Sequence, residues 1–270
     1  YWSHDMGGFE GQPDPDVFIR WFPFGALSSH SRLHGSDSYR VPWMYGDDAV
    51  RVAQRFAALK NRLMPYLGTH ARAISTDGMP LLRHLILQYP DDPGVRHVDT
   101  EYLLGPDLLV APVFDGDGAV QVYLPTDGWT SLLDGSHLAV RGWHRQQHAV
   151  DSLPVLVPDG TVLPIGADPT RPDYDWADGV ELFLVRPQPG TEQQVRIATD
   201  GEDAVWTVRC TDTAITVTAD HDRRWTVRVI GVDDTLSATD TGELPDDIPD
   251  LAAGQRFAPM PGRRDITIEH

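Results

Sequence analysis

Four side chains near the start of the chain have the types and spacing of a sugar-binding site: Asp5, Phe9, Arg32 and His34. A carboxylate and an imidazole can hydrogen-bond hydroxyl groups, and an aromatic ring can cover the apolar side of a sugar ring. The glycines at positions 7 and 8 would let the backbone turn sharply after Asp5. We expect the four side chains to reach one pocket from two neighbouring loops.

A simpler interpretation of the same residues stays open. An aspartate followed by two glycines forms an ordinary turn more often than a site, so spacing alone favours the turn. Arg32 could only pair with a carboxylate, and Phe9 and Trp21 could only fill the core. Sugar cleavage also needs a second carboxylate. Asp5 has no convincing partner, since Asp14 and Asp16 belong to one predicted helix start and Asp47 and Asp48 to another.

The histidines do not predict a metal site. His30 and His34 are four residues apart, a spacing that presents two ligands on one face only in a helix, and residues 28–34 do not look helical. His144 and His148 fit a surface turn better than a ligand set. We therefore expect no metal and no cofactor.

Residues 1–79 read as strand–helix units that would position the site. Short strands are predicted at residues 1–4 and 27–32, and Asp14 to Asp16 offer N-cap chemistry for the helix between them. A second helix starts at Asp47 and Asp48, and its apolar stripe runs from Val52 to Leu67. Pro23 should remove a hydrogen bond from the first helix and kink it. Alternating strands and helices favour a parallel α/β architecture.

Two such units cannot close a parallel barrel, which needs eight units and about 250 residues. Either the first 79 residues form a small layered cap, or six further units precede Tyr1 in a longer protein. The abrupt aromatic start, Tyr1-Trp2-Ser3-His4-Asp5, favours the second possibility.

From about residue 80 the apolar residues repeat with period two, between frequent Pro, Gly and Asp residues, which predicts all-β structure. Strands are expected at residues 108–114, 120–124, 129–133, 155–157, 180–185, 194–197, 205–210, 215–217 and 225–230. A proline-rich stretch at 167–172 predicts a boundary. We divide the chain into a barrel end at 1–79, a proximal β-sandwich at 80–167 and a distal β-domain at 168–270, whose tail from Asp233 could be poorly ordered.

Composition limits the partners. The formal net charge of −18 argues against nucleic acid and against an anionic membrane surface, whereas neutral sugars remain compatible. The single cysteine, Cys210, excludes an internal disulfide and points to a reducing compartment, the cytoplasm, with a secreted protein lacking disulfides as the alternative.

Several ordered motifs are similar to one known family. Trp2-Ser3-His4-Asp5-Met6-Gly7-Gly8-Phe9-Glu10 resembles the segment after the acid/base loop in α-xylosidases of glycoside hydrolase family 31, and residues 28–35 with 38–43 resemble the next active-site loop. Further matches lie at residues 59–67, 89–92, 104–113 and 171–174. The resemblance covers essentially residues 1–230. The sequences of the motifs at residues 28–35 and 38–43 resemble the bacterial α-xylosidase branch more than the α-glucosidases.

The resemblance implies the end of a (β/α)₈ TIM barrel followed by two C-terminal β-sandwich-like domains. By position, Asp5 resembles the carboxylate that supports the −1 subsite, Phe9 an aromatic lining it, and His34 a histidine that binds sugar hydroxyls. Arg32 would orient the loop. Family members cleave with retention of configuration, using two aspartates that would precede Trp2, so no catalytic residue is assigned here and this chain alone is expected to be inactive.

The implied activity is removal of terminal α-xylosyl residues from an α-xyloside or a related oligosaccharide. The full-length enzyme could form a homo-oligomer, a question that the sequence leaves open. An α-glucosidase or an α-transglycosylase of the same family is the first alternative. A non-catalytic carbohydrate-binding β-module is the second, with Trp129, Trp143, Trp206 and Trp225 as aromatic candidates. Aromatic residues in sandwiches more often fill the core.

Overall fold

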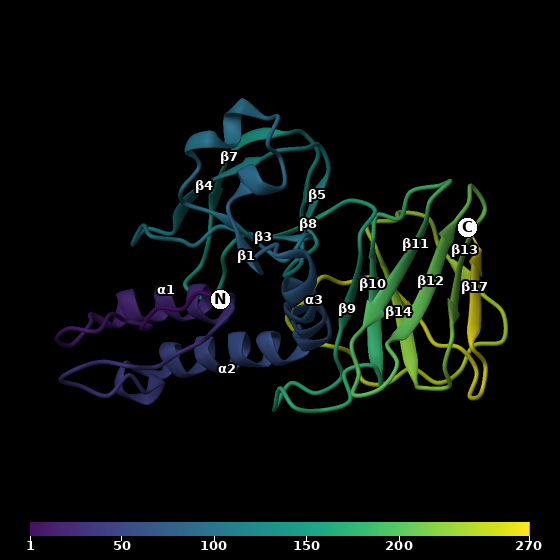
Figure 1. The fold of residues 1–270 in the computed structure, drawn as a ribbon, viewed down its shortest axis with the longest axis horizontal. Helices are drawn as coiled ribbons and strands as arrows, with labels where there is room; N and C mark the ends of the chain where they lie inside the picture. The colour runs from purple at the N-terminus through teal and green to yellow at the C-terminus, as the bar shows by residue number, and fades with distance from the viewer. Residues whose placement is uncertain (270) are drawn as a thin grey trace.

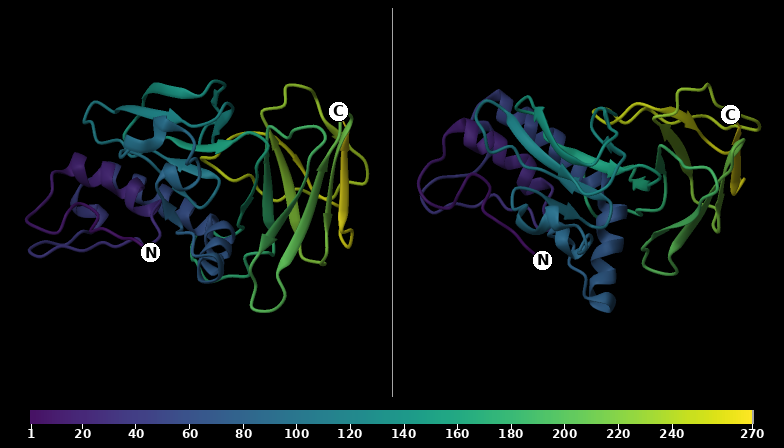
Figure 2. Two further views of the ribbon diagram at one scale, coloured as in Figure 1. Left: turned by 45° about the horizontal axis from the view of Figure 1, so that its top comes forward. Right: turned by 90° about the horizontal axis from the view of Figure 1, so that it is seen from above.

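The computed structural model describes residues 1–269 and shows three helices beside two groups of β-strands (Figure 1). The helices are α1 (Pro15–Ala26), α2 (Asp47–Arg62) and α3 (Met64–Asp77), with short 3₁₀ turns at Pro42–Met44, Leu85–Leu87 and Pro93–His97. Helices α1 and α2 lie side by side, and the turned views place the distal strands at the opposite end of the molecule from them (Figure 2).

The proximal strands form one six-stranded sheet and one separate hairpin. The sheet has the order β1-β2-β3-β8-β5-β6, and β4 pairs only with β7. Their bounds are β1 Leu82–Arg83, β2 Tyr102–Leu104, β3 Leu108–Val110, β4 Ala119–Leu124, β5 Trp129–Ser131, β6 His137–Leu138, β7 Gly142–Gln147 and β8 Val155–Pro158. The helices and these strands share one hydrophobic core, which Phe18, Phe56 and Trp129 help to fill.

The distal strands form two sheets with a second core between them. The sheet orders are β16-β14-β10-β9 and β11-β12-β13-β17-β15. Their bounds are β9 Val162–Ile165, β10 Val180–Val185, β11 Glu192–Ile197, β12 Ala204–Cys210, β13 Ala214–Ala219, β14 Trp225–Ile230, β15 Ser237–Ala238, β16 Gln255–Phe257 and β17 Asp265–Glu269. Trp206, Val217 and Val227 lie in this second core.

The first helix begins as its sequence predicts. The Asp14 carboxylate accepts a hydrogen bond from the Asp16 backbone N–H at 2.9 Å, and Pro15 occupies the first turn. The helix runs past Pro23 to Ala26, so Pro23 lies within the last turn, and its carbonyl still accepts a hydrogen bond from Leu27 N–H.

Three sequence-based expectations are wrong. Residues 1–4 and 27–32 are not regular strands, because the two segments meet in one isolated parallel bridge, Asp5 to Arg32, and in scattered hydrogen bonds such as His30 N–H to the Trp2 carbonyl. The stripe from Val52 to Leu67 is divided between α2 and α3, which meet at Leu63, since Pro65 lacks an N–H and disfavours α-helical geometry before it.

The tail after Asp233 is not poorly ordered either. It contributes β16 and β17, which pair with β14 and β13. The stretch between them crosses back to the proximal part, where Ile248 and Ala252 join the first core and Ala252 N–H donates to the Leu132 carbonyl at 2.8 Å. We call residues 243–253 the strap.

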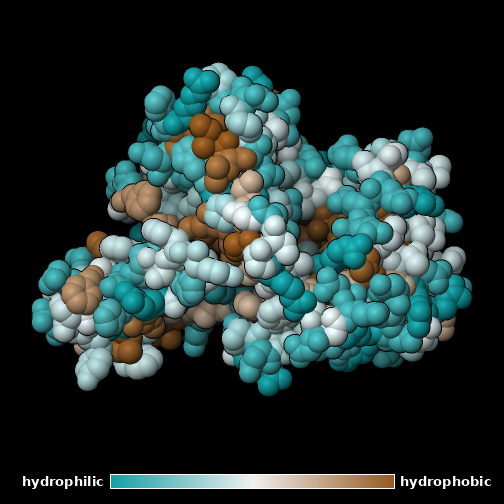
Figure 3. Space-filling view, viewed as in Figure 1, coloured by the Kyte–Doolittle hydropathy of each residue, from teal (hydrophilic) through white to brown (hydrophobic). Residues whose placement is uncertain are grey.

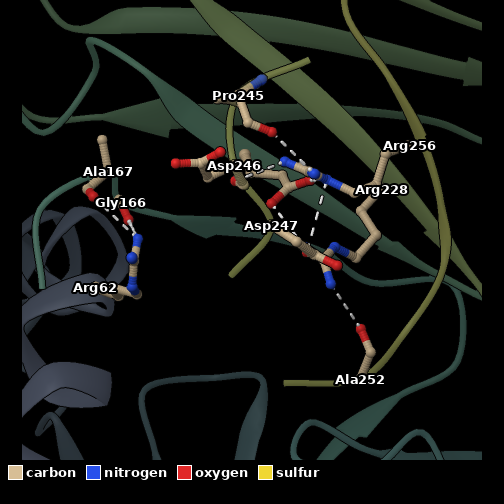
Figure 4. Close-up of polar contacts among 10 residues, drawn as sticks. Arg62, Gly166, Ala167, Arg228, Pro245, Asp246, Asp247, Ala252 and Arg256 are labelled. Atoms are coloured by element: carbon tan, nitrogen blue, oxygen red, sulfur yellow. Dashed lines mark hydrogen bonds and ion pairs between the residues drawn. The ribbon is translucent and has the colours of Figure 1, made fainter. Parts of the chain in front are cut away.

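Buried arginines hold the strap in place. Arg228 on β14 and Arg256 on β16 both pair with Glu181 on β10, at 3.0 and 2.7 Å, and Arg228 also reaches Asp247 of the strap at 2.5 Å. Arg228 donates a further bond to the Ala252 carbonyl at 3.1 Å. Figure 4 shows these side chains converging, with Arg62 nearby donating to the carbonyls of Gly166 and Ala167. Arg228 therefore joins β14 to the strap, and Arg62 joins α2 to the segment just after β9.

The surface in the view of Figure 3 is mainly hydrophilic over the distal strands, while apolar atoms gather over the β4–β7 lobe and along the seam between that lobe and the helices. No helix among residues 1–269 is both long and apolar enough to cross a bilayer.

Candidate functional site

Two segments joined by α1 run side by side in parallel, and they bring the predicted site residues into two pairs, Asp5 with Arg32 and Phe9 with His34. Side-chain hydrogen bonds repeatedly link residues 27 positions apart, among them Trp2 N–H to Ser29 Oγ, Arg32 Nε to Asp5 Oδ1, and Ser36 Oγ to the Phe9 carbonyl. Parallel pairing needs a crossover between the two segments. Helix α1 is that crossover, so the spacing of Asp5 and Arg32 follows from its length.

Asp5 and Arg32 form an ion pair at one end of this parallel pair. The Arg32 Nε–H donates to Asp5 Oδ1 at 2.6 Å, and a second guanidinium nitrogen contacts the same oxygen. The Asp5 side chain is 13% exposed and that of Arg32 is 56% exposed. Both of these contacts engage Oδ1, so the partly buried carboxylate keeps acceptor capacity for a ligand hydroxyl while the guanidinium fixes its orientation.

Phe9 and His34 form the second half of the candidate site. Their ring centroids are 5.4 Å apart with an interplanar angle of 35°, and both side chains are exposed. An exposed phenylalanine beside an imidazole offers an apolar face next to a hydrogen-bonding group. No hydrogen bond or ring contact between described residues joins this pair to Asp5 and Arg32, so convergence of all four on one ligand stays a prediction.

A buried arginine that the sequence analysis did not single out supports both loops. Arg40 is 2% exposed, and its guanidinium donates to the carbonyls of Gly8 at 3.0 Å and Gly11 at 2.6 Å. The same group lies against Gly35, where an added Cβ would come within 2.7 Å of Arg40 Cζ. Arg40 therefore connects the loop that carries Phe9 with the loop that carries His34.

Lys60 on α2 supports the Arg32 segment from below. Its ammonium donates to the Ser28 carbonyl at 2.8 Å and to Ser31 Oγ at 2.6 Å. Burial lowers the pKa of Lys60 to about 8. In the sequence, only the position of Lys60 within the family-like motif at residues 59–67 pointed to this residue.

His4 lies behind the site with both ring nitrogens occupied. Trp21 Nε1–H donates to His4 Nδ1 at 2.5 Å, so the proton of the neutral ring sits on Nε2, which lies 3.2 Å from Ser28 Oγ. Burial lowers the pKa of His4, an effect that Asp5 partly opposes. His4 and Trp21 thus act as a polar support for the first segment.

The other carboxylates considered as partners of Asp5 have local roles. Asp14 caps α1, and Asp48 pairs with Arg51 at 2.5 Å within the first turn of α2. Asp5 therefore gains no carboxylate partner from Asp14 or Asp48.

The histidines make no metal cluster in the described part of the chain. His144 Nε2 lies 2.6 Å from the Val140 carbonyl, and His148 Nδ1 lies 2.9 Å from Ser152 Oγ. These contacts explain both residues as parts of the hairpin surface.

A parallel pair of segments joined by a helix and followed by two β-units fits the end of a barrel-based enzyme with C-terminal β-domains. The chain matches three domain models in succession: the TIM-barrel domain of glycosyl hydrolases family 31 at residues 1–70, the family 31 C-terminal domain at 78–163, and the C-terminal domain of alpha-xylosidase YicI at 175–270. The chain belongs to glycoside hydrolase family 31.

Curated relatives include two α-xylosidases. The chain is 41% identical over 192 residues to an alpha-xylosidase of Emericella nidulans, covering 68% of this chain and 25% of that protein. It is 40% identical over 210 residues to alpha-xylosidase XylQ of Lactiplantibacillus pentosus, covering 75% and 27%. The chain thus spans about a quarter of the length of these relatives.

Solved structures share the fold. A Flavobacterium johnsoniae dextranase complexed with isomaltotriose aligns with a TM-score of 0.82 at 22% identity, covering 100% of this chain and 40% of that one. An α-xylosidase of Xanthomonas citri aligns with a TM-score of 0.74 at 22% identity, covering 98% and 31%. The expected fold class, the end of a TIM barrel followed by C-terminal β-domains, is confirmed.

Proposed function

We propose that the protein is a retaining, exo-acting α-xylosidase that removes terminal α-xylosyl residues from oligosaccharides. The observation that carries this proposal is the 40–41% identity to two α-xylosidases, together with a match to an α-xylosidase C-terminal domain at residues 175–270.

The buried single cysteine, Cys210, supports a reducing compartment such as the cytoplasm as the location of the protein.

In this proposal the site residues hold one sugar ring. Both Arg32 contacts use Asp5 Oδ1, so Asp5 Oδ2 accepts hydrogen bonds from sugar hydroxyls. His34 binds a further hydroxyl. Phe9 covers the apolar side of the ring. Support comes from the Asp5–Arg32 ion pair and the Phe9–His34 contact, which lie on parallel segments.

The 270-residue chain alone is proposed to bind but not to cleave. Glycoside hydrolysis requires two carboxylates flanking the bond, about 5–5.5 Å apart in retaining enzymes. Asp14 and Asp48 are engaged at helix starts, which leaves Asp5 without a partner from either start. Measured turnover of an α-xyloside by the purified chain would contradict this assignment.

The test of substrate and site uses an active enzyme that contains this chain. We expect it to release xylose from an aryl α-xyloside faster than glucose from the matching α-glucoside. Asp5→Asn and His34→Ala should each lower kcat/KM by about tenfold or more, because each removes a hydrogen bond to the bound sugar. Arg51→Met, an exposed change on α2, is the control and should leave kcat/KM unchanged.

A specific observation favours the alternative of another α-glycoside specificity. The chain is 30% identical over 176 residues to a 1,6-alpha-glucosyltransferase of Sporosarcina globispora. Preferred cleavage of the α-glucoside, or transfer of glucose to an acceptor sugar, would replace the α-xylosidase proposal with this one.

A further inference from the structure

The outer face of the β4–β7 hairpin carries an exposed tryptophan that is held in place from behind. Trp129, Trp206 and Trp225 are buried in the two cores, whereas Trp143 is 55% exposed. Trp143 lies directly opposite Tyr123 in the antiparallel register, and their ring centroids are 5.3 Å apart in an edge-to-face arrangement. The Tyr123 hydroxyl donates to Asp92 at 2.9 Å, which fixes this ring as the support of Trp143.

Trp143 borders a hollow of about 380 Å³ between the hairpin and the loop after β3. Phe114 borders the same hollow and is 68% exposed. The Phe114 ring packs edge-on against Phe24 of α1, with centroids 6.0 Å apart, so it too is supported from below. The hollow shares no lining residue with the set Asp5, Phe9, Arg32 and His34.

Side chains with free hydrogen-bonding capacity line the same hollow as the two aromatic rings. His97, Asp99 and Gln121 line the hollow and are exposed. Their side chains make no hydrogen bond or ion pair with any other described residue, and neither does the indole N–H of Trp143. Together they offer a carboxylate, an amide, an imidazole and an indole donor to one ligand.

We propose that this hollow is a second carbohydrate-binding site, separate from the candidate active-site residues, that takes a neutral oligosaccharide. Two exposed aromatic rings provide faces for sugar rings, and the polar side chains that line the same hollow match hydroxyl groups. Asp99 and Asp115 border the hollow, and the chain carries a net charge of −18, so a polyanion is disfavoured. The site would hold a neighbouring part of a polymeric substrate on the enzyme.

Isothermal titration calorimetry of the full 270-residue chain tests the proposal, with isomaltotriose and a xyloglucan oligosaccharide as probes. We expect binding of at least one probe by the wild type, and about tenfold weaker binding after Trp143→Ala, a change worth about 1.4 kcal/mol. Trp143→Phe should retain most of the affinity. Val140→Ala alters an exposed side chain just before the same strand and should bind as the wild type does.

The double variant Asp5→Asn/His34→Ala separates this site from the candidate active site. Retained heat of binding in the double variant, lost on Trp143→Ala, supports the hollow as an independent site. Equal binding by the wild type and Trp143→Ala, or silence of both probes with a folded wild type, overturns the proposal. Circular dichroism of every variant checks folding. A self-association in sedimentation that Trp143→Ala abolishes, without any sugar binding, would assign the hollow to a second copy of the chain instead.

Discussion

Two cations, the buried Arg40 and the half-buried Lys60, hold the candidate site from behind with hydrogen bonds to backbone carbonyls. Asp5, Phe9, Arg32 and His34 could be grouped from the sequence because their side-chain types suggest sugar chemistry. Arg40 and Lys60 could not be found in this way. Their hydrogen-bond acceptors are backbone carbonyl oxygens, which every residue has, so no side-chain type in the sequence marks the partner. Gly35 was the available signal, because only a residue without Cβ leaves room for the Arg40 guanidinium.

Replacing Arg40 should destabilise the protein strongly. Arg40→Met leaves the carbonyls of Gly8 and Gly11 without their donor, and we expect a loss of about 2–4 kcal/mol in the free energy of unfolding. Arg51→Met, at an exposed ion pair on α2, should cost less than about 0.5 kcal/mol. Urea denaturation measures both variants, and equal losses would show that Arg40 has no special role.

Glu101 should make stability depend on pH. Burial raises the pKa of Glu101 to about 8, although its carboxylate accepts a hydrogen bond from Tyr123 N–H at 3.0 Å. Between the usual pKa of 4.5 and about 8 the folded state holds a proton that the unfolded state has released. Stability should therefore fall as pH rises through this window, by at most about 1.4 kcal/mol per pH unit, and level off above it.

Glu101→Gln isolates that contribution, because glutamine can still accept the Tyr123 hydrogen bond and does not titrate. The difference in melting temperature between variant and wild type should grow from pH 5 to pH 8 in favour of the variant. A constant difference over this range would show that Glu101 is ionised in the folded protein. His70, whose pKa burial lowers to about 4, is common to both proteins and cancels in the comparison.

At the scale of elements, the sequence pattern predicted what depends on local chemistry and missed what depends on distant partners. The cap at Asp14 and the strands with period two follow from neighbouring residues. The division of α2 from α3 follows from Pro65, but the continuous stripe from Val52 to Leu67 concealed it. The absence of regular strands at residues 1–4 and 27–32 reflects pairing that stops at one bridge.

Helix α3 should be sensitive at one glycine. The Trp176 indole of the 167–179 connection packs directly on Gly68, and an added methyl group there would overlap the ring. We expect Gly68→Ala to destabilise the protein by about 1–3 kcal/mol through overpacking. Gly116→Ala, where no atom lies within 4 Å of the added Cβ, is the matched control and should change the melting temperature little.

At the scale of the whole molecule, the strap links the distal sheets to the first core. Its polar anchor is the set formed by Glu181, Asp247, Arg228 and Arg256. Alternation along β14 puts Arg228 on the face opposite Val227 and Val229, and that face is buried: the Arg228 side chain is 1% exposed and lies over the Phe183 ring, 4.6 Å from its centroid. The strap covers this face through Asp247 and the Ala252 carbonyl, which both accept hydrogen bonds from Arg228.

Breaking this anchor should loosen the distal part. Arg228→Met removes one partner of buried Glu181 and the donor to the Ala252 carbonyl, and we expect a loss of about 3 kcal/mol or more. Arg224→Met, at an exposed pair with Asp178, should cost less than about 1 kcal/mol. Hydrogen exchange should show faster exchange in the strap for the first variant alone, and unchanged protection there would contradict the anchor.

The position of β17 has a consequence for biosynthesis. This strand, Asp265–Glu269, lies between β13 and β15, so the sheet of β11, β12 and β13 is completed only after Asp265–Glu269 have been synthesised. Until then β13 presents an open edge, which neighbouring nascent chains could pair with. A protein that ends shortly before Asp265 should therefore aggregate in the cell, because the edge of β13 would stay unpaired.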